Sequence, residues 1–135
     1  MMTQPDALAN PVGQIKVVRG QVQLQRAGQL QPAMVGMPVQ GGDIVITGSD
    51  GAAGITFIDN SLISTGPGSA FVIDEYQFDP TTHAGKFKAT LRRGTLAGVS
   101  GKMVKHEPES MRIATPSAIM GVRGTEFAIR VDDNP

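Results

Sequence analysis

Glycine and proline interrupt this chain at short intervals along its whole length. The 135 residues include 17 glycines and 9 prolines, and both residue types mark turns and weaken helices. Between them, short segments alternate apolar and polar residues with the period of two that a half-buried strand requires. The stretches around Ile15 to Val17 and Val22 to Leu24 are examples. The pattern leaves no room for a long helix, so we predict a single compact all-β domain of about ten short strands.

Three Arg-Gly pairs suggest how these strands are arranged. Each pair lies between two strand-like segments: Arg19-Gly20, Arg93-Gly94 and Arg123-Gly124. Recurring corners are typical of coils stacked on one another, although irregular spacing leaves chance recurrence as the alternative. We expect a β-solenoid-like fold or an irregular β-sandwich over residues 14–131, preceded by a flexible tail over residues 1–13.

Turn residues locate several connections within this domain. The clearest hairpin is predicted at Asp59-Asn60-Ser61, because Asp and Asn tolerate the positive φ of tight turns. Residues 26–42 are rich in Gly and Pro and are interpreted as loop. Phe87–Leu91 and Thr95–Val99 are predicted as two strands separated by Arg92-Arg93-Gly94. Residues 100–110 are charged and polar, with no helix predicted.

Composition excludes several classes of function. Lys+Arg and Asp+Glu number 12 each, whereas a dedicated nucleic-acid binder normally has a basic excess. There is no cysteine, which excludes thiol catalysis, disulfides and cysteine metal sites. No apolar run is long enough for a membrane helix, so no membrane insertion is expected. The first residues lack the basic and apolar regions of a signal peptide.

The residues carry no recognisable catalytic constellation. Both histidines, His83 and His106, lie in polar stretches that read as surface loops. The cluster His106-Glu107-Pro108-Glu109 lacks the second histidine of a zinc protease, and Pro108 would break the helix that such a site needs. We therefore predict no catalytic residue, no metal site and no cofactor.

The most unusual segment is residues 113–127, which is dense in small residues yet carries Arg123 and Glu126 among apolar neighbours. In a structural interpretation, Arg123 is buried and its guanidinium reaches backbone carbonyls or a carboxylate. Losing one partner of such a buried pair would cost roughly 3–5 kcal/mol, so Arg123→Ala would be strongly destabilising. In a functional interpretation, the same side chain contacts a partner or ligand.

The same segment resembles the signature of the FecR domain family. The matching residues are Thr115, Pro116, Gly121, Val122, Arg123, Gly124, Thr125, Glu126 and Phe127. Three further stretches resemble elements of that family in the same order. They are Gly42 to Gly48, Ile55 to Leu62 (with Asn60 in place of the usual Gly) and Leu96 to Gly101.

The resemblance implies an extracytoplasmic, non-enzymatic module of the envelope of Gram-negative bacteria, with a periplasmic location. FecR-like regulators receive a signal from an outer-membrane transporter and pass it to a cytoplasmic sigma factor. The anti-sigma segment and the membrane helix of those regulators are not found in this sequence, so sigma-factor regulation is not part of the expectation. What remains is protein–protein interaction or signal relay with an envelope protein partner.

Three hypotheses for the molecular role follow. In the first, a partner pairs with an open sheet edge or docks on a polar face. The candidate edge carries Gln21, Gln23 and Gln25, whose alternation also fits a plain solvated strand face. In the second, the module binds a cell-wall glycan, for which these glutamines and Tyr76 are the only hint. In the third, it is a structural spacer in a larger surface protein.

Overall fold

The computed structural model describes residues 11–131, which form twelve strands and one short helix. The all-β single domain is confirmed, with two strands more than the ten expected. The strands are β1 (Gly13–Arg19), β2 (Val22–Arg26), β3 (Gln29–Pro32), β4 (Pro38–Val39), β5 (Ile44–Thr47), β6 (Ala52–Phe57), β7 (Leu62–Thr65), β8 (Ala70–Phe78), β9 (Gly85–Val99), β10 (Met111–Ala114), β11 (Ile119–Gly121) and β12 (Glu126–Val131), and the helix is α1 (Lys102–His106).

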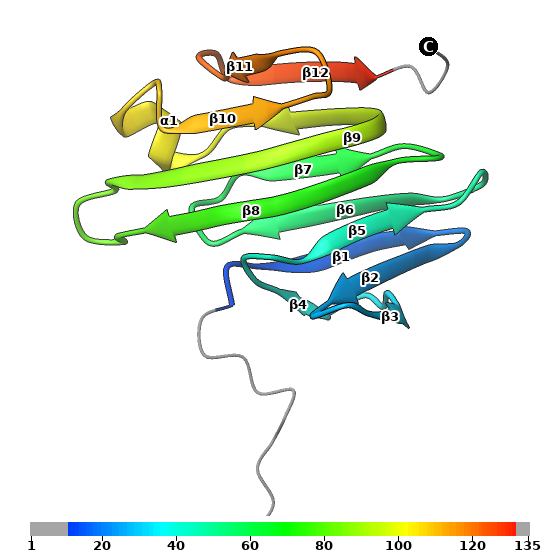
Figure 1. Cartoon of the computed structure of the whole chain (residues 1–135). Coiled ribbons are helices and arrows are strands. Elements are labelled where there is room, and N and C mark those ends of the chain that lie inside the picture. Colours follow the sequence, from blue (N-terminus) through cyan, green and yellow to red (C-terminus); the bar gives the residue numbers. More distant parts are fainter. Residues whose placement is uncertain (1–10, 132–135) are drawn as a thin grey trace, which may run out of the picture.

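The strands belong to one sheet that curls so that its two halves face each other (Figure 1). One half contains β3, β2, β5, β8, the first part of β9, β10 and β11. The other contains β4, β1, β6, β7, the second part of β9 and β12. Pairing is antiparallel except between β9 and β10, which run parallel. The strands stack from β3 and β4 at one end to β11 and β12 at the other.

The core lies between the two halves, because alternate residues of each strand point inward. Ile15 and Ile63 from one half, and Leu24 and Leu91 from the other, are fully buried. An aromatic cluster joins the halves at the centre. The ring centroid of Phe57 on β6 lies 5.3 Å from that of Tyr76 on β8 and 4.8 Å from that of Phe87 on β9.

The Arg-Gly pairs lie where the chain passes from one half of the sheet to the other. Arg19-Gly20 joins β1 to β2, Arg93-Gly94 lies within β9, and Arg123-Gly124 lies between β11 and β12. Gly20 and Gly94 have φ of +60° and +93°, which an L side chain rarely adopts. All three pairs therefore lie at crossings between the two halves, as the corner interpretation predicted.

The hairpin predicted at Asp59-Asn60-Ser61 is confirmed as the β6–β7 connection. Asn60 adopts φ +73°, which is the positive value that the turn was expected to need. Asp59 and Ser61 point into the molecule and are fully buried, whereas Ile58 and Asn60 are exposed.

Three segments differ from the expectation. Phe87–Leu91 and Thr95–Val99 are parts of one strand, β9, which bends at Gly94 instead of ending there. The presumed loop at residues 26–42 contains β3, which folds back on β2 through the turn residues Ala27 and Gly28, at φ 54° and 80°. The presumed polar segment 100–110 contains α1, whose Met103 and Val104 are buried.

The first strand also begins slightly earlier than expected. Residues 1–10 of the expected flexible tail lie outside the described residues. Val12 is already buried, and its backbone N–H donates to the Val39 carbonyl at 2.8 Å. β1 then begins at Gly13, one residue before the predicted start.

Candidate functional site

The family-like segment at the C-terminal end is spread over a hairpin, a connecting loop and the start of β12. Thr115 and Pro116 form the turn between β10 and β11, where Thr115 N–H donates to the Ala118 carbonyl at 2.7 Å. Val122 is buried. The carbonyl oxygens of Gly124 and Thr125 accept hydrogen bonds from the Ser100 hydroxyl at 2.8 Å and the Ser100 N–H at 2.7 Å. These contacts attach the segment to the end of β9.

Phe127 completes this attachment. Its ring lies on Gly98, where an added Cβ would come within 2.4 Å of the Phe127 ring. Gly98 belongs to the family-like stretch Leu96 to Gly101. Only glycine leaves room at this position for the Phe127 ring on the opposite strand. Glu126, at the start of β12, is exposed.

The buried interpretation of Arg123 is wrong. The guanidinium does reach a carboxylate, with Nη2 3.0 Å from Glu109 Oε2, but the two side chains are 72% and 59% exposed. The preceding Val122 points into the core, so strand-like alternation turns Arg123 outward. An exposed ion pair contributes about 0–1 kcal/mol, so Arg123→Ala is expected to change stability far less than a buried pair would.

The Asp59 carboxylate, from a second family-like element, is the centre of a buried polar cluster. Its Oδ1 accepts hydrogen bonds from the Ser61 hydroxyl at 2.6 Å and the Tyr76 hydroxyl at 2.8 Å. Its Oδ2 accepts from the N–H of Met103 at 3.3 Å. The cluster therefore joins the β6–β7 turn, β8 and α1. Burial, reinforced by the Asp59 charge, raises the pKa of Tyr76 well above its ordinary value.

Asp43, from a third family-like element, is the buried partner of an ion pair. The Arg26 guanidinium donates to both carboxylate oxygens, at 2.9 and 2.7 Å, and the Gln40 N–H adds a bond at 2.9 Å. The hydrogen bonds that Arg26 donates to Asp43 raise the pKa of Arg26. This two-point contact holds the loop before β5 against β2. Like the Asp59 cluster, it is a structural contact rather than an opening for a ligand.

The predicted edge at Gln21, Gln23 and Gln25 is not an edge. β2 lies between β3 and β5 and pairs with both. Gln21 precedes β2 and its N–H donates to the Asp50 carboxylate at 3.2 Å. Gln23 and Gln25 are half-buried on the outer face. The error follows from reading residues 29–32 as loop, because that segment is the strand that covers the edge.

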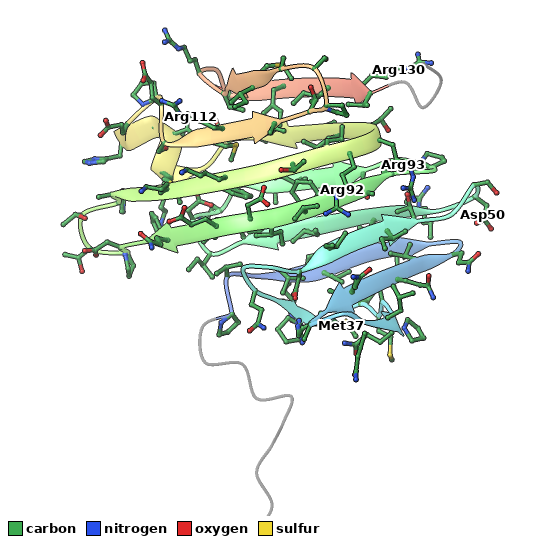
Figure 2. The ribbon with its side chains drawn as sticks, in the orientation of Figure 1. Met37, Asp50, Arg92, Arg93, Arg112 and Arg130 are labelled. Atoms are coloured by element: carbon green, nitrogen blue, oxygen red, sulfur yellow. The ribbon has the colours of Figure 1, made fainter. Side chains whose placement is uncertain are left out.

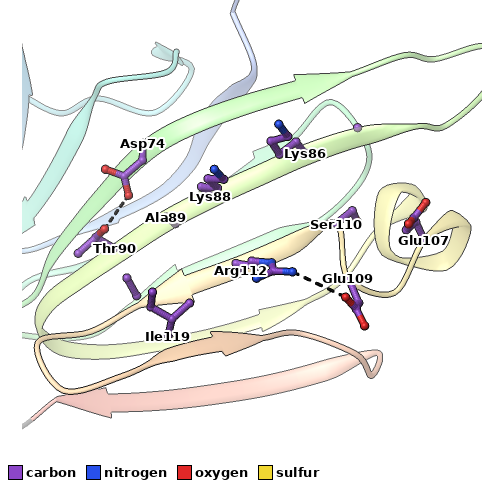
Figure 3. A pocket seen from close by; sticks show the side chains of 12 residues that line it. Asp74, Lys86, Lys88, Ala89, Thr90, Glu107, Glu109, Ser110, Arg112 and Ile119 are labelled. Carbon is purple, nitrogen blue, oxygen red and sulfur yellow. Dashed lines mark hydrogen bonds and ion pairs between the residues drawn. The ribbon is translucent and has the colours of Figure 1, made fainter.

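A cleft of about 710 Å³ lies on the outer face of β8, β9 and β10 (Figure 3). Lys86 and Lys88 project from β9, and Arg112 projects from β10 beside Lys88 in the parallel register. The rim is formed by the segment that follows α1 and by Ile119 of β11, which is 73% exposed.

Charges of both signs line this cleft. The three basic side chains face three acidic ones, Asp74, Glu107 and Glu109. Asp74 Oδ2 accepts from the Thr90 hydroxyl at 2.6 Å, and Lys88 Nζ lies 3.8 Å from Glu75 Oε1. Glu109 forms an ion pair with Arg112 at 3.7 Å and a second one with Arg123. Through this second pair, Arg123 of the family-like segment contacts the rim of the cleft. The cleft therefore presents charges of both signs to solvent.

Sequence reasoning missed the cleft. The alternation Lys86-Phe87-Lys88 does place both lysines on one face of a strand. Arg112 follows more than twenty residues later. Nothing in the sequence shows that its strand, β10, pairs in parallel with β9 and so places Arg112 beside these lysines.

The two histidines and the tyrosine lie away from the cleft. Neither histidine lines it: His83 stacks on Phe78 at 5.8 Å between centroids, and His106 ends α1. Within residues 11–131, no group of three or more His, Cys, Asp or Glu side chains could hold a metal ion. Tyr76, a hint for glycan binding, is buried and donates to Asp59, and no aromatic side chain lines the cleft.

Comparison with known proteins assigns the chain to a family. Residues 43–135 match the family model described as FecR protein. Neither a curated protein nor a solved structure matches the chain. No helix in the described part of the chain is long and apolar enough to span a membrane.

Proposed function

The chain belongs to the FecR protein family, and from this membership we propose that it is a non-enzymatic, extracytoplasmic interaction module. The family is one of signalling proteins associated with the bacterial envelope. In this proposal the module binds an envelope protein through the mixed-charge cleft of β8, β9 and β10 and relays that binding as a signal. The periplasmic location and the protein partner are both parts of the proposal.

The observation that carries the proposal is the cleft itself. Its lining comes from several elements and includes charged side chains of both signs, with Lys88 and Arg112 about half exposed. A partner segment with both acidic and basic residues could replace the weak exposed pairs Lys88–Glu75 and Arg112–Glu109 at little cost, because such pairs contribute about 0–1 kcal/mol each. Complementary charges of this kind favour specificity and rapid association.

The test is recovery of a partner from envelope extract, with the purified domain as bait and mass spectrometry as the readout. The cleft variant is Lys86→Glu with Lys88→Glu, and the matched control is Lys16→Glu with Arg19→Glu on the exposed face of β1. Both variants should give the far-ultraviolet circular dichroism of the unmodified chain, because all four side chains are exposed.

We expect one envelope protein at near-stoichiometric level with the unmodified chain and with the control, and its loss with the cleft variant. Equal recovery by the cleft variant would contradict the cleft as the binding site. Recovery of no specific protein by any bait would contradict the interaction module and favour the glycan or spacer hypothesis, which a polysaccharide screen then separates.

A further inference from the structure

We infer that β12 pairs with β12 of a second copy of this chain, so that two molecules join their sheets edge to edge. Within residues 11–131, β12 pairs only with β9, and its other side is an edge of the sheet. No β12 residue lines the cleft. The two surfaces can therefore be tested separately.

The hydrogen-bond pattern shows which backbone groups of β12 point outward. The Ser100 N–H donates to the Thr125 carbonyl, so Thr125 and Ser100 form a hydrogen-bonded pair of the β9–β12 ladder. In an antiparallel ladder such pairs alternate, so Phe127, Ile129 and Val131 also bond to β9. The backbone N–H and C=O groups of the residues between them, Glu126, Ala128 and Arg130, point away from β9 along the edge.

The edge strands of the sheet differ in how well they are protected against pairing with another chain. Proteins blunt exposed edges with proline, charged side chains (lysine above all), bulges or very short strands, and the two charges of β12, on Glu126 and Arg130, are of opposite sign. At one end, β3 and β4 contain Pro32 and Pro38. At the other end, β11 has three residues. β12 has six residues with neither proline nor lysine, and its register with β9 has no bulge.

The charges along β12 match a second copy in one antiparallel register. With a two-fold axis at Ala128, Glu126 of each chain lies opposite Arg130 of the other, and Ala128 faces Ala128. These are the residues whose backbone groups point outward, so the register forms up to about six backbone hydrogen bonds. Both side chains are exposed on the outer face (Figure 2 shows Arg130 at the end of β12). A shift of the register by two residues would remove both charge pairs.

The inner face of the same register is also complementary. It places Phe127 opposite Ile129 of the other copy, in the closely spaced pairs of the ladder. An aromatic residue opposite a β-branched one is a favourable cross-strand pair. Phe127 and Ile129 pack against the core but remain only partly buried. Each therefore has exposed apolar surface that the contact with a second copy would bury.

Sedimentation equilibrium at low salt tests the pairing. The unmodified chain is expected to show a concentration-dependent monomer–dimer equilibrium. Glu126→Arg and Arg130→Glu should each weaken dimerisation about tenfold or more, because each substitution sets two like-charged pairs opposite one another. Lys16→Glu, a charge reversal on β1, should leave the equilibrium unchanged.

Two combinations distinguish charge pairing from damage to β12. The double variant Glu126→Arg with Arg130→Glu restores opposite charges and should recover the dimer. An equimolar mixture of the two single variants should form a heterodimer, since each then supplies the charge that the other lacks. A monomer at all concentrations of the unmodified chain would overturn the inference. So would single variants that dimerise as well as the unmodified chain, or a double variant and mixture that stay monomeric.

Discussion

At the scale of single residues, two buried carboxylates hold much of the irregular structure in place. Asp43 and Asp59 are fully buried, and each is satisfied by hydrogen bonds from separate parts of the chain. A buried carboxylate without such partners would be very costly. Both residues lie in family-like elements of the sequence, which explains these elements as requirements of the fold rather than of a ligand.

The Tyr76 hydroxyl predicts how stability depends on alkaline pH. Its pKa is raised in the folded state, so the folded protein keeps the proton when the unfolded chain would lose it. The contribution of Tyr76 to stability is therefore complete below the ordinary tyrosine pKa of about 10 and falls as the pH rises beyond it. Tyr76 is the only tyrosine, and there is no tryptophan, so tyrosinate absorbance reports this group directly.

We expect the tyrosinate absorbance to appear only when the protein unfolds. Circular dichroism measured in the same alkaline titration reports the unfolding. A smooth titration near the ordinary pKa, with the sheet still folded, would contradict the buried Asp59–Tyr76 contact. Tyr76→Phe provides the control, because it should remove the absorbance change while leaving any unfolding that other groups cause.

Burial along single strands was predictable from the sequence, whereas the surroundings of particular side chains were not. Val22 and Leu24 are buried and Gln23 and Gln25 are less so, as the alternation predicted. Arg123 was placed among apolar neighbours because its sequence neighbours are apolar. Its real environment depends on Glu109, which lies on another segment of the chain.

At the scale of elements, β9 connects the two halves of the sheet. Its first part pairs with β8 and β10, and its second part pairs with β7 and β12. The change of side occurs at Gly94, where φ is +93° and an added Cβ would come within 2.1 Å of the Ser69 hydroxyl oxygen. The Ser69 hydroxyl also donates to the Thr95 carbonyl at 3.2 Å, which fixes the bend.

Gly94→Ala should therefore destabilise the protein strongly. The positive φ costs about 1–2 kcal/mol for an L residue, and the overlap with Ser69 adds about 1–3 kcal/mol. Urea denaturation should show this loss in the free energy of unfolding. Gly121→Ala is the matched control, because nothing lies within 4 Å of the added Cβ and φ is not positive there. A loss for Gly94→Ala no larger than for the control would show that the bend does not need glycine.

Element boundaries were predicted where turn chemistry is typical and missed where it is not. Asn60 is a common residue at positive φ, and the β6–β7 hairpin was found. Alanine rarely adopts positive φ, so the tight turn at Ala27 between β2 and β3 was not predicted. As a result, β3, the strand that covers the edge of β2, was not predicted either. Gly94 was interpreted as a break because glycine usually ends a strand, whereas here it bends one.

At the scale of the whole molecule, the sheet is most enclosed at its middle. β8 lies between β5 and β9, and β9 has neighbours along both edges, whereas β3, β4 and β11 each pair on one side only. Local opening requires the loss of fewer hydrogen bonds and less burial at the ends. The amides of β3, β4 and β11 should therefore exchange with solvent faster than those of β8 and β9.

Hydrogen exchange followed by mass spectrometry checks this order, at a concentration low enough to keep the chain monomeric. The predicted sequence of exchange is β3, β4 and β11 first and the β8–β9 ladder last. Equal protection at the ends and in the middle would contradict the view that the sheet opens from its ends.

The all-β fold class was predictable from the composition and from the frequent glycines and prolines. Three of the corners were predictable from the Arg-Gly pairs. The cleft could not be foreseen, because it depends on β10 running parallel to β9 after a connection that includes α1. Such long-range pairing leaves no periodic signal in the sequence. The residues of the cleft are ordinary strand residues until the fold places them together.

The continuity of β9 has a mechanical consequence. Lys86 and Lys88 of the cleft and the residues that pair with β12 belong to one uninterrupted strand. A pull applied by a partner at the cleft would travel to the β12 edge through covalent bonds, while the hydrogen bonds on either side of the strand would be loaded in shear. If the proposed partner and the proposed second copy are both bound, a displacement of Lys86 would thus be transmitted to the β12 edge without the unfolding of any element of this domain.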